Sequence, residues 1–259
     1  IPSYSNPTPI YLGNGWYEIN YTNNGYFYPN NEITSIKTLM VAGGGGSSIN
    51  DTYFSFNQNG GGAGGIIWID ELNIFNVSYG IPLEITIGTG GLPAISETRQ
   101  GSNGGNTIFG SLTAIGGGGA GSINDNDDGR DGGSGGGAGG YYSGFFRYND
   151  ENPGTGTQPS QPSLSGLYGY GNEGGLQHGG GALGTPNEYS GLEAWGRTLA
   201  TGGRNMGTSP LPTSTYGDGG SVNSTTTSAG SDGIVIIRYY IAPPEITFNS
   251  PSNGSFHST

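Results

Sequence analysis

Three kinds of residue in this 259-residue chain could take part in chemistry: glycine loops, clustered acidic groups and crowded aromatic rings. Gly116, Gly118 and Gly121 follow a strand-like run in the spacing G-x-G-x-x-G, which is typical of a loop that binds the pyrophosphate of a dinucleotide. Such a loop needs a helix directly after it and an acidic residue about 20 positions later, and this sequence offers neither. No Lys-Ser/Thr pair completes a P-loop. We therefore interpret these glycines as structural and expect no cofactor.

The acidic run NDNDDGRDGG (124–133) places oxygen ligands at alternate positions, Asn124, Asn126 and Asp128, ahead of Gly129. This arrangement imitates the first half of an EF-hand loop. Position twelve of that loop would be Gly135, where calcium coordination needs a bidentate glutamate. We expect a solvated acidic loop, with Asn124, Asn126 and Asp128 kept only as a weak calcium candidate.

The sequence offers little for catalysis. It contains two histidines, His178 and His257, and neither has a nucleophile at a recognisable spacing. No motif pairs two carboxylates, although a glycosidase pair stays open because residues distant in sequence can meet in space. Cysteine is absent, which excludes disulfides and thiolate metal sites. We predict that the protein is not an enzyme.

Aromatic residues are the most informative chemical feature, and they crowd irregular inserts between the glycine runs. One reading is that the rings pack over glycine segments, which have no side chains of their own. The other is that they form a contact surface, because rigid amphipathic rings provide area at low entropic cost and stack on sugars. We predict contact with a receptor or a neighbouring subunit for the inserts collectively. The candidate residues are Tyr53, Phe54, Phe56, Tyr141, Tyr142, Phe145, Phe146, Arg147, Tyr148, Tyr168, Tyr170 and Trp195.

The overall charge narrows the range of partners. The formal net charge is −12, from 19 acidic and 7 basic residues. Nucleic-acid binding needs a basic stripe for phosphate contacts, and none is visible. An anionic membrane surface is disfavoured for the same reason. No apolar run approaches the roughly 20 residues that span a bilayer, so we expect no membrane insertion.

The elements that position these residues must be built from a chain with 56 glycines, about three times the usual share of roughly 7%. A disordered linker would hold few aromatic residues, whereas this chain has 3 Trp, 17 Tyr and 9 Phe. Residues 16–28 predict a hairpin that turns at Asn24-Gly25. Further strands are expected over 36–42, 65–69, 83–87, 107–115 and 233–241, and almost no α-helix is expected.

The glycine runs between these strands need a physical explanation. Each ordered glycine costs about 0.5–1 kcal/mol more than alanine, so the main chain itself must recover this free energy. Bundled polyglycine II helices, which share the dihedral angles of polyproline II, allow every segment to hydrogen-bond to its neighbours. We therefore predict an all-β fold with a polyglycine II bundle. Its expected parts are an N-terminal hairpin region (1–34), a glycine-rich body (35–241) and a linker that begins a truncated immunoglobulin-like module (242–259).

The order of these landmarks resembles a known family. The run YTNNGYFYPNNEITSIKTLMVAGGGG (21–46) looks like the opening of glycine-rich domains in phage and large-virus structural proteins. The later runs at 83–91, 101–121 and 228–240 resemble the following landmarks in the same order, so the resemblance covers about residues 16–241. The family resembles the distal adhesins of T-even-type phage tail fibres, in which a polyglycine II sandwich displays variable loops. The tail at 242–256 resembles the linker and first strand of an immunoglobulin-like module.

This resemblance implies a non-enzymatic module on a virion surface or outside the cell. It would attach to a glycan or protein receptor of the host through its aromatic loops, and it would contact other virion or fibre subunits. One alternative is a structural subunit of a capsid, fibre or extracellular filament that uses the same loops for self-association. A second alternative is an ice-binding protein.

Overall fold

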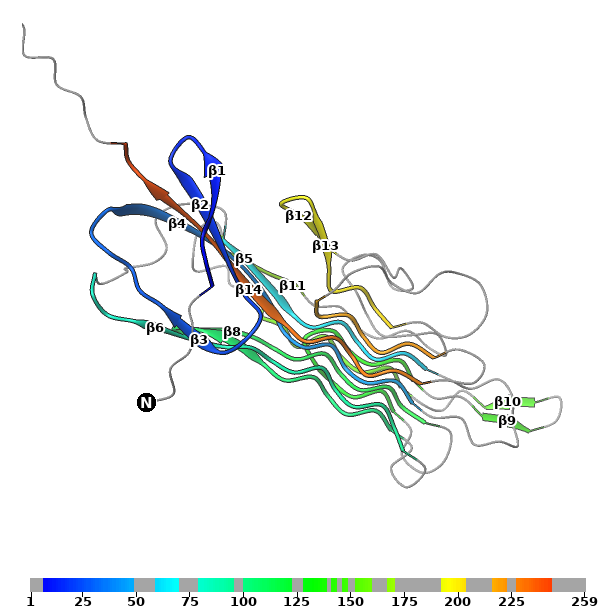
Figure 1. Ribbon diagram of the computed structural model, residues 1–259. Helices are drawn as coiled ribbons and strands as arrows, with labels where there is room; N and C mark the ends of the chain where they lie inside the picture. The colour runs from blue at the N-terminus through cyan, green and yellow to red at the C-terminus, as the bar shows by residue number, and fades with distance from the viewer. Residues whose placement is uncertain are drawn as a thin grey trace, which may run out of the picture.

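The computed structural model describes residues 7–48, 59–69, 79–95, 100–122, 128–138, 152–159, 192–203, 216–222 and 227–243, and the backbone of 141–143, 146–148 and 167–170. These residues form strands and extended segments without any helix, which confirms the all-β prediction. No helix in the described ranges is therefore long and apolar enough to cross a membrane. Stacked sheets occupy one end of the molecule, and glycine-rich segments run side by side from them toward the other end (Figure 1).

The larger sheet has six antiparallel strands in the order β1-β2-β14-β4-β5-β11. Their bounds are β1 (Ile10–Gly13), β2 (Trp16–Tyr21), β14 (Ile234–Ile241), β4 (Ile33–Val41), β5 (Ile66–Ile69) and β11 (Leu167–Tyr170). Strand β14, from the C-terminal part of the chain, pairs with β2 on one side and β4 on the other. The two halves of the sequence are therefore joined in the middle of one sheet.

The smaller sheet has four antiparallel strands in the order β3-β6-β7-β8. They are β3 (Gly25–Phe27), β6 (Leu83–Thr86), β7 (Thr107–Phe109) and β8 (Leu112–Ala114). Alternate residues of each strand face the larger sheet, and together they form the main apolar core. Phe27 and Phe109 meet edge to face there, with ring centroids 6.2 Å apart. Each such buried side chain contributes about 1.5–3 kcal/mol through the area removed from water.

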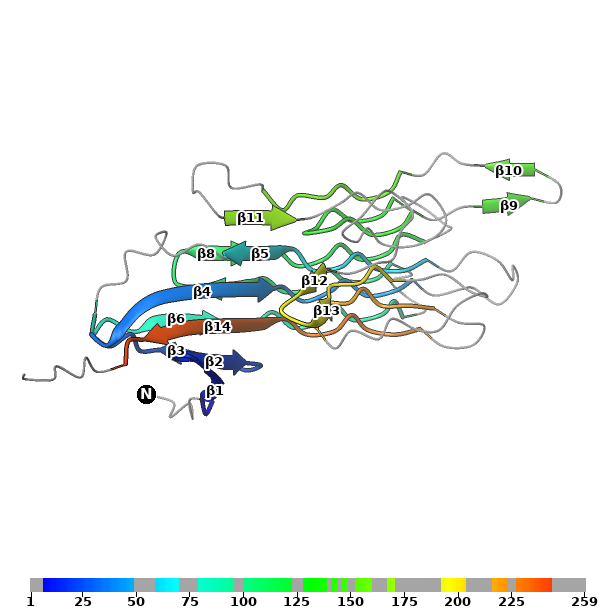
Figure 2. The ribbon, with the colours of Figure 1, turned by 90° about the horizontal axis from the view of Figure 1, so that it is seen from above.

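A hairpin of β12 (Leu192–Ala194) and β13 (Arg197–Leu199) covers the opposite face of the larger sheet. Ala194 and Leu199 of this hairpin pack on Leu39, Ile66 and Ile236 in a second apolar core. Another hairpin, β9 (Tyr141–Ser143) with β10 (Phe146–Tyr148), lies beyond the glycine segments, far from the sheets (Figure 2). The larger sheet is thus packed on both faces, whereas β9 and β10 form a separate two-stranded sheet.

An N-terminal hairpin exists, but it is not the one predicted over 16–28. Strands β1 and β2 form it, and it turns at Asn14 and Gly15, whose φ angles are 50° and 80°. These positive angles suit a tight turn between antiparallel strands. The predicted turn at Asn24 is instead the place where the chain passes from the larger sheet to the smaller one, because β3 pairs with β6.

The other strand predictions hold except one. Strands β4, β5, β6 and β14 lie within two or three residues of the predicted ranges. The single strand predicted over 107–115 is wrong, because this stretch is a hairpin of β7 and β8. Gly110 turns the chain there with a φ of 56°. Leu112 and Phe109 consequently pair across the hairpin rather than following one another along a strand.

The glycine segments continue the strands and are held together by main-chain hydrogen bonds. Residues 42–48, which follow β4, lie among six other segments. Their N–H groups donate to three neighbouring segments in turn, with a repeat of three residues. The N–H groups of residues 42, 45 and 48 donate to the segment 59–65, and those of residues 43 and 46 donate to the segment 102–105. Those of residues 44 and 47 donate to the segment 228–231. Their carbonyl groups accept with the same repeat: 43 and 46 from 117–120, 44 and 47 from 91–94, and 45 from Gly220.

The close approach of these backbones excludes side chains. A Cβ atom at Gly45 would overlap the carbonyl oxygen of Gly118, and one at Gly116 would overlap that of Gly104. A Cβ atom at Gly61 would likewise overlap the carbonyl oxygen of Gly45. Only glycine lets the segments lie this close at these positions, so the interior of this half of the molecule consists largely of main chain, with small buried side chains such as Ala63 and Ala120.

Candidate functional site

We name the ends of the glycine segments that lie farthest from the sheets the tip (Figure 1). The described chain leaves the body at the tip and returns to it there around five inserts. These inserts are 49–58, 96–99, 123–127, 139–151 and 223–226. The first and last strands of the described chain, β1 and β14, lie instead in the larger sheet, away from the tip (Figure 1).

Hydrogen bonds join the flanking residues of the first, third and fourth of these inserts. The Ser48 N–H donates to the Asn59 carbonyl at 3.1 Å, and the Asn59 N–H donates to Ser48 Oγ at 3.0 Å. Asn59 Nδ2 donates to the Gly121 carbonyl at 3.4 Å, and the Gly121 N–H donates to the Gly137 carbonyl at 2.9 Å. Ser48 and Asn59 are fully buried, so these contacts are shielded from water.

The remaining two inserts join the same network through Ser47. The Ser47 carbonyl accepts from the Ala94 N–H at 2.8 Å, directly before the insert 96–99. The Ser47 N–H and Oγ donate to the carbonyl of Ser228, which follows the insert 223–226. Ser228 Oγ in turn donates to the Ser221 carbonyl at 3.0 Å. All five inserts therefore emerge from one hydrogen-bonded platform.

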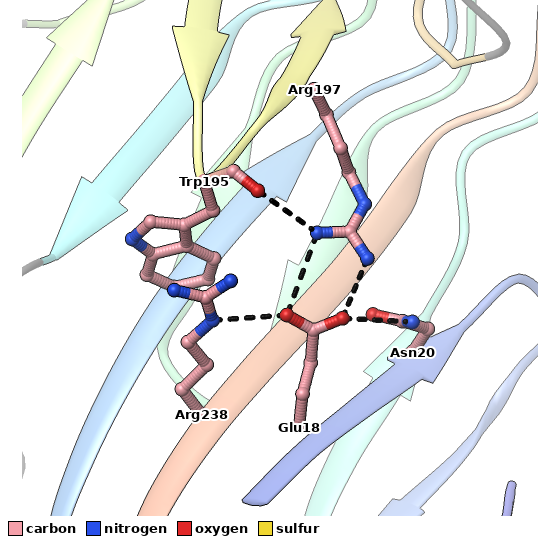
Figure 3. A network of polar contacts seen from close by, with 5 residues as sticks. All are labelled: Glu18, Asn20, Trp195, Arg197 and Arg238. Carbon is pink, nitrogen blue, oxygen red and sulfur yellow. Dashed lines mark hydrogen bonds and ion pairs between the residues drawn. The ribbon is translucent and has the colours of Figure 1, made fainter. Parts of the chain in front are cut away.

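A second candidate site lies on the outer face of the larger sheet, under the β12–β13 hairpin. We call Glu18, Asn20, Trp195, Arg197 and Arg238 the Glu18 cluster (Figure 3). Arg197 Nη2 lies 2.6 Å from Glu18 Oε1, and Arg238 Nε lies 2.9 Å from Glu18 Oε2. Asn20 Nδ2 donates to Glu18 Oε1 at 3.2 Å. One carboxylate thus ties the hairpin to the sheet.

The electrostatics of the cluster fix the charge of Glu18. Burial by itself raises the pKa of this carboxyl, but the hydrogen bonds from Arg197 and Arg238 outweigh it and hold the pKa below its ordinary value. Both carboxylate oxygens already accept hydrogen bonds. A carboxylate that stays ionised and fully engaged is unsuited to general acid–base catalysis, which needs a pKa near the working pH. Glu18 therefore has a structural role as a clamp, because it holds the β12–β13 hairpin on the larger sheet.

Trp195 completes the cluster from the turn of the hairpin. Its φ of 51° places it in the left-handed region, and Gly196 follows with a φ of 76°. The guanidinium of Arg238 lies over the Trp195 ring, 4.3 Å from the centroid (Figure 3). Arg197 Nη1 also reaches the Trp195 carbonyl at 3.5 Å. The hairpin turn, the sheet and the clamp consequently hold one another in place.

The predicted contact residues that the structure describes lie on separate elements. Tyr141, Tyr142, Phe146, Arg147 and Tyr148 belong to β9 and β10 at the tip. Tyr168 and Tyr170 belong to β11 at the edge of the larger sheet, opposite Trp68 and Ile66. Trp195 lies in the Glu18 cluster. Tyr53, Phe54, Phe56 and Phe145 lie outside the described residues.

The weak calcium candidate is described only at Asp128, because Asn124 and Asn126 lie outside the described residues. Asp128 Oδ1 accepts the N–H of Asn152 at 2.6 Å, so the carboxylate serves the main chain of a neighbouring segment. Within the described ranges, no three His, Cys, Asp or Glu side chains gather to hold a metal ion. His178 and His257 also lie outside these ranges.

The main-chain N–H groups of the glycines in the dinucleotide-like motif are also hydrogen-bonded within the protein. The Gly116 N–H donates to Asn106 Oδ1 at 2.9 Å, and the Gly118 N–H donates to the Ser134 carbonyl at 2.8 Å. These groups point at neighbouring segments of the chain. Main-chain donors that bind the protein itself are not available to cradle a phosphate.

The Glu18 cluster was not predicted from the sequence. Glu18 is separated from Arg197 by 179 positions and from Arg238 by 220, so no local motif links them. One signal was available, because Glu18 is a lone acidic residue inside the aromatic strand WYEINY. A charged residue in such a strand usually needs a partner when it is buried.

Comparison with known proteins gives one match. A family model described as a glycine-rich domain matches residues 22–240. This range begins just before β3 and includes nearly all of β14, so it covers the smaller sheet, the glycine segments and the larger sheet apart from β1 and β2. A search of curated proteins finds no match.

Proposed function

The chain belongs to the glycine-rich domain family, and on this premise we propose that it is a non-enzymatic attachment module of a virion surface protein. It binds a glycan or protein receptor of the host through the tip, and it joins other virion or fibre subunits through the sheet end. Its place of action is the virion surface or the extracellular space. The resemblance of its landmarks to phage adhesins supports this proposal.

We propose further that the body is a polyglycine II bundle. The support comes from the hydrogen bonds of residues 42–48, which repeat every three positions and reach six neighbouring segments. A helix with three residues per turn directs successive N–H groups at 120° to one another, which is the polyproline II geometry without proline. A body built in this way is rigid without side chains, so the inserts are free to vary in sequence.

The single observation that carries the proposed function is the platform at the tip. Five inserts share one hydrogen-bonded base, and the first and last strands, β1 and β14, lie at the opposite end of the molecule. An attachment module needs this polarity, because the end joined to the particle must lie away from the end that meets the host. Tyrosine-rich sequence at 141–148 provides the contact residues that such a surface uses.

The test compares two variants that each lose a stretch of sequence. In the first, residues 141–148 at the tip are replaced by a Gly-Ser stretch of equal length. In the matched control, residues 70–78, which connect Ile69 at the end of β5 to Tyr79 in the sequence, are replaced in the same way. Fluorescently labelled proteins are applied to a printed glycan array and to candidate host cells.

We expect the tip variant to lose binding and the control to keep it, with both retaining cooperative thermal unfolding. Equal binding by the tip variant and the wild type would contradict the proposal, as would a loss confined to the control. A tip variant that fails to unfold cooperatively would show that 141–148 supports the fold, and smaller exchanges such as Tyr142→Ser and Tyr148→Ser would then decide the question.

A structural subunit is the second candidate, and strand β1 favours it. Ile10, Tyr11 and Leu12 are 53%, 60% and 45% exposed on an edge strand of the larger sheet. An edge strand with unpaired main-chain groups and exposed apolar side chains is a site for pairing with another chain. Light scattering after size exclusion separates the candidates: a monomer supports the attachment module, and concentration-dependent polymers that Tyr11→Lys abolishes support the subunit.

A further inference from the structure

We propose that Arg238 and Trp195 form a second binding site, specific for a sugar that carries a carboxylate. The site lies on the outer face of the larger sheet and is separate from the tip, so it does not depend on the proposed function. Three features of the described residues carry the inference: a guanidinium held in one orientation, an excess of positive charge and aromatic rings beside it.

Arg238 is oriented from two directions. Its Nε donates to the buried carboxylate of Glu18 at 2.9 Å, and its guanidinium plane lies over the Trp195 ring at 4.3 Å. Within the described part of the chain, its two Nη atoms make no hydrogen bond (Figure 3). The side chain is 24% exposed, so solvent reaches part of it. A planar guanidinium with both Nη atoms available binds a carboxylate through two parallel hydrogen bonds.

The charge of the cluster favours an anion. Two guanidinium groups, Arg197 and Arg238, face the single carboxylate of Glu18, which leaves a net charge of 2 − 1 = +1. The chain as a whole carries −12. Because Arg197 donates to Glu18 through both Nη atoms, it neutralises Glu18 and leaves the outward edge of Arg238 to an incoming anion. A local positive site on an acidic protein concentrates negatively charged ligands.

The neighbouring rings favour a sugar over a peptide. Tyr240 lies two positions from Arg238 along β14 and therefore on the same face of the sheet. Its partner on the neighbouring strand β2 is Trp16. The rings of Trp16 and Tyr240 are 5.4 Å apart and partly exposed, and the ammonium of Lys37, the β4 residue opposite Arg238, lies over the Trp16 ring 5.4 Å from its centroid. A pyranose seated on these rings would place a carboxylate substituent toward the Nη atoms of Arg238. Uronic acids and sialic acids have this chemistry.

The experiment measures binding to the full chain by calorimetry and by quenching of tryptophan fluorescence. Three probes are used: trigalacturonic acid, the neutral galactotriose, and an acidic peptide of alternating Gly and Asp. The variants are Arg238→Lys, which keeps the charge but loses the planar fork, and Arg238→Gln. The matched control is Arg130→Gln, which makes the same charge change at an exposed residue of the glycine body.

We expect the wild type and Arg130→Gln to bind trigalacturonic acid with equal affinity and to bind galactotriose at least tenfold more weakly. Arg238→Lys and Arg238→Gln should each lose about tenfold or more in affinity for the acidic sugar, as expected for a lost charge-assisted hydrogen bond. Thermal unfolding of each variant shows that the protein is folded at the temperature of the measurement.

Three outcomes would overturn the inference. The first is equal affinity of the wild type for the acidic and the neutral sugar. The second is unchanged binding by Arg238→Lys, because the fork would then be irrelevant. The third is equal binding of the acidic peptide, which would show that the site takes any carboxylate. None of these outcomes touches the proposed function, because the variants leave the tip intact.

Discussion

At the scale of single residues, Glu18 explains how an irregular hairpin is fixed to a sheet. Its side chain is only 3% exposed, and it accepts from guanidinium groups on β13 and β14. Burial of a charge is costly unless partners satisfy it, and here three donors do so, with Asn20 as the third. The consequence is that β12 and β13 hold a defined position over Leu39 and Ile236.

Glu18→Gln tests this clamp. The variant leaves two guanidinium groups without a charged partner, so we expect the free energy of unfolding to fall by roughly 2–4 kcal/mol at neutral pH. Because the pKa of Glu18 is lowered from 4.5 in the folded state, the stabilisation is present above 4.5 and is lost as the pH falls through the lower folded pKa. The wild type and the variant should therefore converge in acid. Urea unfolding at several pH values measures this.

Glu84→Gln is the matched control, because Glu84 is exposed on β6 and its removal changes the charge equally. We expect its unfolding free energy to stay within about 0.5 kcal/mol of the wild type at neutral pH. An equal loss in both variants, or a Glu18→Gln deficit that persists unchanged in acid, would show that the ion pairs do not hold the hairpin.

At the scale of the elements, the glycine segments reverse the usual division between core and connection. A conventional core buries side chains, whereas the segment 42–48 buries its own amide groups against six neighbours. Each hydrogen bond contributes about 1 kcal/mol net, so many are needed to offset the entropy of ordered glycine. Such segments should be intolerant of any side chain.

Gly45→Ala tests this intolerance. The new methyl would overlap the Gly118 carbonyl, so the segments must separate, and we expect a loss of about 3 kcal/mol or more in unfolding free energy. Gly80→Ala is the control, because a methyl there meets nothing within 4 Å and only the positive φ of 81° opposes it. That change should cost about 1 kcal/mol. Similar losses in both variants would mean that backbone contact does not require glycine at position 45.

At the edge of the bundle, side-chain oxygens take the place of a neighbouring segment as acceptors for main-chain N–H groups. Asn103 and Asn106, three positions apart, accept the N–H groups of Gly119 and Gly116. Asp128 and Asp131, also three apart, accept those of Asn152 and Thr155. The repeat of the side chains therefore matches the repeat of the main chain, and part of the acidic character of the protein serves this purpose.

Amide exchange in Asn106→Leu tests this capping role. Loss of the Asn106 Oδ1 acceptor leaves the Gly116 N–H unpaired, so we expect its hydrogen exchange to accelerate at least about tenfold. Asn106→Asp keeps an acceptor at the same place and should leave the protection of Gly116 nearly unchanged. Continued protection of Gly116 in the leucine variant would show that the side chain is not the cap.

At the scale of the whole molecule, the elements that stabilise the fold lie at one end and the inserts lie at the other. Apolar cores and paired strands occupy one end, and the five inserts emerge at the other (Figure 1). Because each insert begins and ends on a bonded platform, we expect its own residues to have little part in holding the body together. The tip should therefore accept foreign sequence.

Replacing residues 96–99 and 223–226 together by Gly-Ser stretches of equal length tests this tolerance. The flanking bonds of Ser47 with Ala94 and Ser228 remain, so we expect a loss below about 1 kcal/mol, which corresponds to roughly 2–4 °C in the unfolding temperature. Scanning calorimetry measures the change. A fall of tens of degrees, or loss of a single cooperative transition, would mean that the inserts are part of the core.

Much of the fold could be predicted from the sequence because the signals are local. β-Branched and apolar runs marked β4 and β14, and ordered glycine followed from the abundance of aromatic residues. The turn at Asn14-Gly15 went unrecognised because Asn24-Gly25 carries the same signal, and only the pairing of β3 with β6 distinguishes them. Glu18 could not be paired with Arg197 or Arg238, because nothing in the sequence sets the position of the β12–β13 hairpin or the register of β14 on β2.

The sequence alone determined that this protein is an ordered, β-rich chain in which glycine alternates with strands, because residue type limits the local backbone and which surfaces can be buried. The tertiary structure decided which segments are neighbours, where the residues that flank the five inserts meet, and that one carboxylate receives two guanidinium groups. The physical reason is that a glycine segment has no side chains that would make one neighbouring segment more favourable than another. Its main-chain groups bind any segment that approaches, so the packing of the sheets had to select the neighbours.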